Sequence, residues 1–460
     1  MTHVLNAQEV QTNPYPPGPA PLKNIVEQLR FGYQVSQNIL AWMMDNIQKY
    51  GETVHAQIGK SHMFIFTNPE DIHTVTVSLA NKFNKGPEYK DQQRGLARFV
   101  GNGILVSDGE FWKKQRRLVS PALHVNRVNT YGDVMVQYTD NMLNTWHDGQ
   151  HLDMDEQMME LTLKIVSQTL FKVDADEYTQ TMGKILSILL RIGADFDIFP
   201  NWVPTPKHRR EERALQELDK ILYALIENWR EASVDRGDLL SMLMLAEDTD
   251  GNHMSDKQLR DEIATLLLAG HETTANMLNW TWYLLSQNPD IEAKLHEEVD
   301  TVLQGRLPTL EDLKSLPYTD MVMKESMRIF PPAWGFTREA NEDVEVNGKF
   351  VPKGSLVSLM VYGMHHDPRW WEDPETFQPE RFAPENEDRF HKRAYLPFGG
   401  GPRVCVGNSF ATMEGRLLIA TIAQRYKFTL APDARIDKEA LVTLRPRHGM
   451  PMIAHLRKPN

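Results

Sequence analysis

The segment Phe398-Gly399-Gly400-Gly401-Pro402-Arg403-Val404-Cys405-Val406-Gly407 decides how this chain is interpreted, because it holds the one cysteine among 460 residues. Its glycines and proline favour a tight backbone before the sulfur, and Gly407 allows a ligand to approach closely just after it. The helix predicted over residues 408–420 would turn its positive N-terminal end toward a thiolate. These features favour an axial metal ligand. The alternatives are a small buried side chain, or a nucleophile served by a His elsewhere in the fold, since none lies within ten residues.

A second segment places polar residues inside an apolar pattern. From Asp256 to Gln287 apolar residues recur with helical spacing, which predicts a helix of roughly 30 residues, about 45 Å long. It should stop near Asn288-Pro289. The stretch Ala269-Gly270-His271-Glu272-Thr273-Thr274 interrupts the pattern. One interpretation is a Thr bonded to its own i−4 carbonyl and a solvated Glu272; the other is a local groove where an alcohol and a carboxylate relay protons.

Both segments resemble motifs of the cytochrome P450 family. The cysteine segment matches F-x-x-G-x-R-x-C-x-G at every fixed position, and the helix segment matches (A/G)-G-x-(D/E)-T-T. Other marks of the family follow in the same order from residue 16 to about residue 453. The resemblance implies a mainly α fold with small β-sheets, in which the long helix crosses over a haem. It also implies a haem-thiolate monooxygenase of the soluble, bacterial type.

The same resemblance assigns catalytic and cofactor roles. Cys405 would be the axial ligand of the iron in haem b, with O2 as the co-substrate. Glu272 and Thr273 would pass protons to the oxygen. Further residues expected to contact the haem are Ala269, Gly270, Phe398, Arg403 and Gly407.

Trp112 and Arg116 stand four residues apart, and therefore on one face of a helix. The family uses this W-x-x-x-R spacing to hold the haem propionates, for which guanidinium groups are suited. By motif position, Arg338 and Arg403 join this clamp.

Glu325 and Arg328 form an E-x-x-R pair. Together with Arg381, which lies in the segment Pro379-Glu380-Arg381-Phe382, this pair resembles the ionic cluster of the family. The spacing alone is a weak signal, because Glu227 and Arg230 show it too. Removing one partner of a buried cluster costs about 3–5 kcal/mol. Glu325, Arg328 and Arg381 are therefore assigned to folding and haem retention, not to turnover.

The substrate pocket implied by the family maps to residues 99–104, 267–269, 333–335 and 441–443. These residues are mostly apolar or small and include no cation, which predicts a pocket for an apolar molecule, a fatty acid or a terpenoid-like one. Trp334 would either narrow one wall or belong to the core. Residues 196–206, rich in aromatics and proline, would line a channel mouth or form a mobile lid. The residues singled out for the pocket are Val100, Leu268, Ala269, Ala333, Trp334, Gly335 and Val442.

Composition narrows the function further. The chain has 50 basic and 62 acidic residues, a formal net charge of −12, and 41% hydrophobic residues, which excludes a disordered chain and a basic nucleic-acid binder. A single cysteine excludes an internal disulfide. The sequence shows neither a signal peptide nor a membrane span. We therefore expect a cytoplasmic protein with a flexible leader over residues 1–14 and one haem domain over residues 15–460.

The chain should depend on an external electron donor, since no glycine-rich nucleotide-binding fingerprint follows a strand. Basic residues within 110–117, together with Arg389, Lys392 and Arg393, would form a docking surface for an acidic carrier. The expected carrier is a ferredoxin or a flavodoxin with its reductase.

Two other functions stay open at this point. One is a peroxide-driven haem-thiolate peroxygenase, although family members of that kind replace the acid and the alcohol that this chain retains. The other is a helical binding protein without catalysis. A zinc site at His365-His366-Asp367 is not expected, because no further ligands with metal spacing accompany it.

Strand signals are few. Residues 63–67 read as a strand, and residues 344–351 predict a hairpin around Asn347-Gly348. Residues 442–444 and 452–455 are predicted to pair with each other. Residues 366–384 contain repeated X-Pro steps and should form an irregular, ordered loop.

Overall fold

The structure of the protein is a computed structural model that describes residues 15–93, 95–172, 175–192, 199, 201–232, 239–247, 251 and 253–457. The predicted leader, residues 1–14, lies outside the described residues, as do residues 196–198 and 200 of the predicted channel mouth. Long helices and several small sheets make up the described part of the chain, which confirms the predicted fold class.

Helices supply most of the described part of the molecule. The helices are α1 (Ile25–Gln37), α2 (Ile39–Tyr50), α3 (Pro69–His73), α4 (Pro87–Lys90), α5 (Ala97–Val100), α6 (Gly109–Val119), α7 (Val125–Val128), α8 (Gly132–Leu143), α9 (Met154–Phe171), α10 (Ala175–Leu189), α11 (Pro206–Ala232), α12 (Leu239–Leu245), α13 (Asp256–Gln287), α14 (Pro289–Leu303), α15 (Pro317–Ile329), α16 (Val361–His365) and α17 (Asn408–Arg425).

The strands form one sheet of five and three smaller ones. In the large sheet the order is β1-β2-β8-β5-β3, with only β2 and β8 parallel. The small sheets have the orders β4-β12-β9, β10-β11 and β6-β7. The strands are β1 (Thr53–Ile58), β2 (Ser61–Phe66), β3 (Phe83–Lys85), β4 (Gln150–Asp153), β5 (Phe336–Ala340), β6 (Val344–Val346), β7 (Lys349–Val351), β8 (Leu356–Leu359), β9 (Tyr426–Leu430), β10 (Lys438–Ala440), β11 (Leu444–Pro446) and β12 (Pro451–Leu456).

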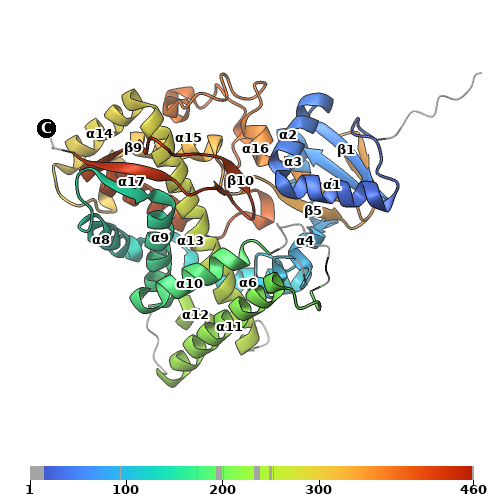
Figure 1. Ribbon diagram of the computed structural model, residues 1–460, viewed down its shortest axis with the longest axis horizontal. Helices are drawn as coiled ribbons and strands as arrows, with labels where there is room; N and C mark the ends of the chain where they lie inside the picture. The colour runs from blue at the N-terminus through green and yellow to red at the C-terminus, as the bar shows by residue number, and fades with distance from the viewer. Residues whose placement is uncertain are drawn as a thin grey trace, which may run out of the picture.

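Helix α13 runs through the middle of the helical part of the molecule, packed along α9, whereas the large sheet lies to one side with α1 to α3 (Figure 1). Its bounds are those predicted. A capping box starts it: the Ser255 hydroxyl accepts from the Gln258 backbone N–H, and the Gln258 side chain accepts from the Ser255 N–H. At the other end Asn288 leaves the helical conformation directly before Pro289, which begins α14. Local signals therefore set both ends of this helix.

The predicted hairpin is confirmed as β6 and β7, and the predicted strand at 63–67 coincides with most of β2. Asn347 and Gly348 both have positive φ, 47° and 81°, as a two-residue type I′ turn requires. The predicted pairing of residues 442–444 with 452–455 is wrong. Strand β11 pairs with β10, whereas β12 lies between β4 and β9. Strands this short take their partners from tertiary packing, which a local pattern does not reveal.

Candidate active site

The cysteine loop is held against the segment 74–78, a single π-helical turn. Gly401 has φ +67°, and a Cβ there would lie 1.9 Å from the Thr76 carbonyl oxygen, so only glycine fits. The Cys405 backbone N–H donates to the Phe398 carbonyl at 2.9 Å, which closes the loop. Helix α17 begins three residues after the cysteine, as predicted. The sequence folds tightly here because its glycines permit backbone angles that other residues avoid.

Cys405 is a free cysteine with solvent-accessible surface, yet the protein atoms around it desolvate its thiol. The side chain therefore faces an internal space. Burial raises the pKa of the thiol, whereas the Gly407 backbone N–H and the Arg116 guanidinium act in the opposite direction by favouring the thiolate. These two groups are the ones that would stabilise a sulfur anion at this position.

Helix α13 opens on one side at its polar interruption. Residues 259–268 are buried, whereas Ala269, Gly270 and Thr273 are partly exposed and lie close together on the helix surface. The Thr273 hydroxyl donates to the Ala269 carbonyl at 2.7 Å, the i−4 bond considered as one interpretation of this motif. A Cβ on Gly270 would meet Val166 of α9 at 2.9 Å, so this glycine also lets the two helices pack closely. Its predicted contact with haem stays a prediction.

Glu272 is buried and not part of a solvated face, since only 1% of it is exposed. Its Oε1 accepts a hydrogen bond from the Thr443 hydroxyl at 2.7 Å. Burial raises the pKa of Glu272 to about 7; Asp155 adds to the rise, and Thr443 and Arg445 oppose it. The carboxyl can therefore both hold and release a proton near neutral pH.

The residues predicted to hold propionates come together around the cysteine loop. The Arg403 guanidinium lies 4.2 Å from the centre of the Trp112 ring and donates to the Ser107 carbonyl at 3.0 Å and to Asp108. Arg116 donates to the Val404 carbonyl at 2.7 Å. The side chains thus tie helix α6, which carries Trp112 and Arg116, to the loop that carries the cysteine.

A buried lysine that the sequence analysis missed joins this group. Lys85 on β3 stands opposite Arg338 on β5 and is only 8% exposed. Burial, Arg338 and Arg403 lower the pKa of Lys85 well below its usual value, and Asp108 and Glu88 only partly offset them. The one sequence signal is a lysine at an inward position of a short strand, two residues after the buried Phe83. Such a concentration of buried cations fits a ligand edge that carries carboxylates, as haem propionates do.

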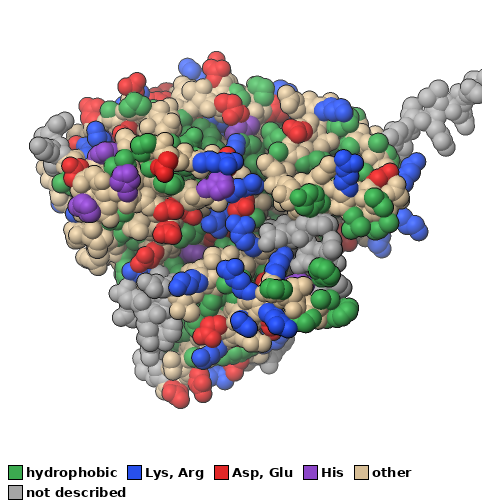
Figure 2. All heavy atoms as spheres, in the orientation of Figure 1, with side chains coloured by type: hydrophobic (Ala, Val, Ile, Leu, Met, Phe, Trp, Pro, Cys, Tyr) green, Lys and Arg blue, Asp and Glu red, His purple; other side chains and the backbone are tan. Residues whose placement is uncertain are grey.

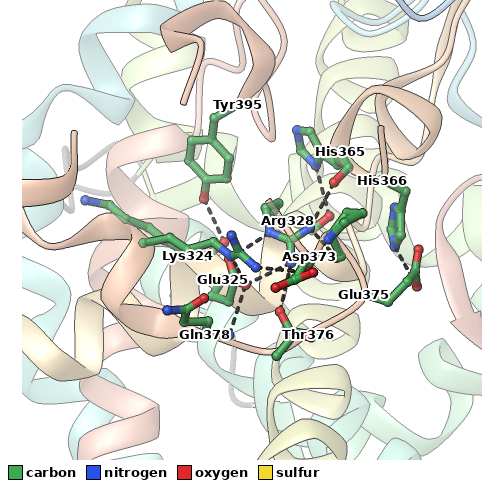
Figure 3. Close-up of polar contacts among 12 residues, drawn as sticks. Lys324, Glu325, Arg328, His365, His366, Asp373, Glu375, Thr376, Gln378 and Tyr395 are labelled. Atoms are coloured by element: carbon green, nitrogen blue, oxygen red, sulfur yellow. Dashed lines mark hydrogen bonds and ion pairs between the residues drawn. The ribbon is translucent and has the colours of Figure 1, made fainter. Parts of the chain in front are cut away.

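The ionic cluster forms around a fully buried pair. Arg328 donates two hydrogen bonds to Glu325, both 2.8 Å long, and Arg381 donates to the same carboxylate at 3.2 Å (Figure 3). Arg328 also donates to the carbonyls of Pro374 and Thr376, at 2.7 and 3.3 Å. The cluster therefore anchors the irregular loop 366–384 to α15: one carboxylate faces two guanidinium groups, both of which also donate to backbone carbonyls.

The two neighbouring histidines serve the same region. The Leu396 backbone N–H donates to His365 Nε2 at 3.0 Å, and His365 Nδ1 contacts the Arg328 carbonyl at 3.1 Å. Burial lowers the pKa of His366 to about 3, and its Nδ1 contacts the Tyr362 carbonyl at 2.9 Å. Backbone contacts thus occupy both nitrogens of His365, whereas His366 has a backbone contact at Nδ1 only and its buried Nε2 lies 3.9 Å from Glu375 Oε2.

A cavity of about 690 Å³ opens between α1, α5, α11 and the sheets. Of the residues singled out for the pocket, Trp334, Gly335 and Val442 line it; Val100, Leu268, Ala269 and Ala333 do not. The Trp334 indole N–H donates to the Leu441 carbonyl at 3.0 Å, so this ring forms part of the wall. The channel-mouth segment reaches the cavity at Asn201. A buried ion pair, Arg98 with Glu211 at 2.5 Å, also lines the cavity, and sequence reasoning missed it.

Three consecutive charged residues of α13 hold the predicted pocket loop, 99–104. Arg260 donates to a carbonyl of the loop at 2.8 Å, and Asp261 and Glu262 accept two of its backbone N–H groups at 2.9 and 3.1 Å. Gly101 packs against Asp261, where a Cβ would come within 2.0 Å of the carboxylate. Burial, reinforced by Asp261, raises the pKa of Glu262 to about 8. This clamp fixes the loop to the same helix that carries Glu272 and Thr273.

A family model described as cytochrome P450 matches residues 16–450. The chain belongs to the cytochrome P450 family. It is 35% identical to cyclooctatin synthase of Streptomyces melanosporofaciens over 89% of this chain and 88% of that protein. It is 34% identical to cyclooctat-9-en-7-ol 5-monooxygenase of the same organism over 84% of each chain, and 32% identical to pentalenene oxygenase of Streptomyces avermitilis over 87% of this chain and 89% of that one.

The fold of this cytochrome P450 matches a solved structure, the retinoic acid-bound cyanobacterial CYP120A1, with a TM-score of 0.85, 24% identity, and 96% of this chain and 99% of that chain covered. The enzyme is a cytochrome P450 monooxygenase that uses haem b and O2. The open thiol, the open face of α13 and the cluster of buried cations all fit that cofactor. Within the described ranges, no helix combines the length and apolar character that crossing a bilayer requires.

Proposed function

We propose that this cytochrome P450 inserts one oxygen atom from O2 into a C–H bond of an apolar, terpenoid-like substrate. The observation that carries the proposal is the pair of neighbours on α13: a buried carboxyl at Glu272, and an alcohol at Thr273 on the open face of the helix. Delivery of two protons to a bound oxygen requires groups of this kind. The pair also favours O2-driven turnover over a peroxide-driven reaction.

In this proposal Cys405 holds the iron of haem b, and the bound haem supplies the activation of O2 by a thiolate-ligated iron. Trp112, Arg116 and Arg338 hold the propionate edge. Thr273 presents its hydroxyl at the open face of α13, and Glu272 resupplies the proton there. The raised pKa of Glu272, about 7, lets the carboxyl start in its protonated form under neutral conditions.

The substrate class is supported by the relatives, whereas the cavity bears only on the size of a ligand that could reach the enzyme. A volume of about 690 Å³ accommodates a molecule of several fused rings or a long chain. The lining of the cavity mixes apolar side chains such as Trp334 and Val442 with charged ones, among them Arg98, Lys207 and Glu211, and it includes no residue of α13. Two relatives carry terpenoid names, cyclooctat-9-en-7-ol 5-monooxygenase and pentalenene oxygenase. A terpenoid therefore ranks above a fatty acid as the candidate.

Electrons would come from a ferredoxin or a flavodoxin with its reductase. Lys113 and Arg117 lie on α6, whose Arg116 contacts the cysteine loop, so this cationic surface adjoins the thiolate side. Some of the predicted charge is compensated within the chain, because Lys113 contacts Glu110 at 2.6 Å, Lys392 contacts Asp388 at 3.6 Å and Arg393 pairs with Glu70. Figure 2 shows basic and acidic side chains intermingled on the face viewed. We therefore expect docking to use a cationic surface that acidic neighbours partly compensate, and to weaken with salt.

The proton-relay roles are tested by coupling. With a reconstituted reductase pair, Thr273→Ala and Glu272→Gln should consume reduced nicotinamide as before but release most of it as peroxide. Thr281→Ala is the matched control, because its hydroxyl makes the same i−4 bond on α13, to Met277 at 2.8 Å, within the core. Unchanged coupling in both Thr273→Ala and Glu272→Gln would contradict the proposed proton relay. A panel of terpenoids and fatty acids, screened for a spin-state shift, tests the substrate class.

A further inference from the structure

We propose that a buried polar seam between α9, α13 and β11 carries protons from the surface to Glu272, and that they enter it at Asp155. The inference rests on the proposed role of Glu272 as proton donor and extends it to the source of the proton. The seam consists of Asp155, Glu272, Asn276, Asn279, Thr443 and Arg445.

The α13 side of the seam is a single polar stripe. Glu272, Asn276 and Asn279 stand at positions i, i+4 and i+7, and therefore on one face of the helix. All three are at most 1% exposed. Thr443 directly precedes β11 and Arg445 lies within it, and each contacts a carboxyl of the seam. Polar groups are costly in such a core unless they are hydrogen-bonded, so the stripe calls for a role.

The inner half of the seam ends at Glu272. The Thr443 hydroxyl donates to Glu272 Oε1 at 2.7 Å and accepts from Asn276 Nδ2 at 3.0 Å. The hydroxyl is able to pass its proton to Glu272 and to take another from a water molecule; the Asn276 amide orients the hydroxyl and keeps its own protons.

The outer half ends at the surface. Asn279 Nδ2 donates to Asp155 Oδ1 at 2.7 Å, and Arg445 Nη2 lies 3.3 Å from Asp155 Oδ2. Asp155 is 6% exposed, whereas the Arg445 side chain is 17% exposed. The partly exposed Arg445 places Asp155 next to the surface; because the guanidinium keeps its protons, a proton from the solvent enters directly at the Asp155 carboxylate.

Three orphaned atoms lie between the halves. Asn276 Oδ1, Asn279 Oδ1 and Arg445 Nε are buried and have no hydrogen-bond partner among the described residues. Buried polar atoms are almost always paired, with protein or with ordered water. Two acceptors and one donor in the same seam form the setting that buried water occupies. Water at these atoms would join the two halves into one path.

Both carboxyls are able to exchange protons near neutral pH. Burial raises the pKa of Asp155 to about 6; Asp153 and Glu156 add to the rise, and Arg445 and Asn279 oppose it. The pKa of Glu272 is about 7, as described above. Each proton that Glu272 gives to the site is replaced by one from Asp155, which takes another from the solvent. One proton moves inward per event, and no electrons move.

The test follows the proton itself, in the haem-loaded full-length protein. After transfer into D2O, the carboxyl band that Glu272→Gln removes from the infrared spectrum reports the deuteration of Glu272. Asp155→Asn and Thr443→Val should each slow this exchange at least tenfold. Glu292→Gln is the matched control, because burial raises the pKa of that carboxyl to about 7 as well, outside the seam. It should leave the exchange unchanged.

Normal exchange in both seam variants would overturn the inference, since a structural or electrostatic role would shift stability or a pKa without slowing deuteration. Where Asp155→Asn does not fold, Thr443→Val carries the test. The proposed function fails separately: if Glu272→Gln stays fully coupled during turnover, the relay is wrong whatever the exchange rates show. If the seam variants exchange slowly and Glu272→Gln still couples its electrons to substrate oxidation, the seam conducts protons to Glu272 but those protons do not go to oxygen.

Discussion

Lys85 and Arg338 face each other across adjacent strands, so two buried cations occupy one pair of positions in the large sheet. Like charges opposite each other in a sheet are destabilising unless an anion compensates them. Asp108 and Glu88 supply part of that compensation, but burial raises the pKa of Glu88. The arrangement therefore favours a bound dianion, and the haem edge is the anion that the family provides.

Lys85→Met should weaken haem retention. Loss of one hydrogen bond to a charged group costs roughly 1.5–3 kcal/mol, which corresponds to haem loss about ten times faster or more. The measurement is the rate of haem transfer to an excess of apomyoglobin. Lys113→Met, which removes an exposed cation of α6, is the control. Equal rates in the two variants would contradict the role of Lys85.

Glu325→Gln should destabilise the protein strongly. Arg328 would remain fully buried without its carboxylate, at a cost of about 3–5 kcal/mol. Denaturant unfolding followed by fluorescence, together with haem absorbance, measures the loss. Glu227→Gln has the same E-x-x-R spacing on an exposed face of α11 and should change stability by less than about 0.5 kcal/mol. Similar losses of unfolding free energy in Glu325→Gln and Glu227→Gln would show that burial of the ion pair is not the cause.

Gly101→Ala should impair binding of apolar ligands beyond its effect on stability. Its φ is +59°, and the new methyl group would collide with Asp261 and push loop 99–104 from α13. Gly149→Ala is the matched control, because that residue also has positive φ, +76°, but open space around it. Gly149→Ala should lose about 1–2 kcal/mol of stability from backbone strain, and Gly101→Ala should lose more, because its methyl group also collides with Asp261. Only Gly101→Ala should weaken the spin-state response, several-fold in dissociation constant.

Glu262→Gln should change how stability depends on pH. The folded-state pKa of Glu262 is about 8, above its unfolded value, so the folded protein binds more protons and loses stability as pH rises between about 5 and 8. At roughly 1.4 kcal/mol per pKa unit, the loss reaches a few kcal/mol. The variant should show a flatter profile and greater stability above pH 8. Thermal unfolding of the wild type and of Glu262→Gln across this pH range measures the difference. If the stability of the two proteins depends on pH in the same way, the prediction is wrong.

Sequence reasoning succeeded where the signal is local. Both ends of α13 follow from Ser255 and from Asn288-Pro289, and the β6–β7 turn follows from Asn347-Gly348. The cysteine loop is local only in part: the positive φ of Gly401 belongs to its own backbone, whereas the close approach of the Thr76 carbonyl comes from a distant segment. The family assignment rests on such segments, and the match over residues 16–450 confirms it.

What the sequence did not reveal depends on distant partners. Thr443 lies 171 residues from Glu272, and nothing near either residue announces the contact. The strand pairing of β12 and the inward position of Lys85 likewise depend on tertiary packing. The roles assigned to Cys405, Glu272 and Thr273 stay predictions that the experiments above address.

The seam draws its members from three segments that are far apart in the chain. Any chimaera of two related enzymes with one crossover between residues 280 and 442 would join the α13 stripe of one parent to the β11 of the other. Such hybrids would keep every motif that identifies the family and still mismatch Thr443 or Arg445 with its partners. Designers of chimaeras of this enzyme should therefore exchange α9, α13 and the β10–β11 hairpin together.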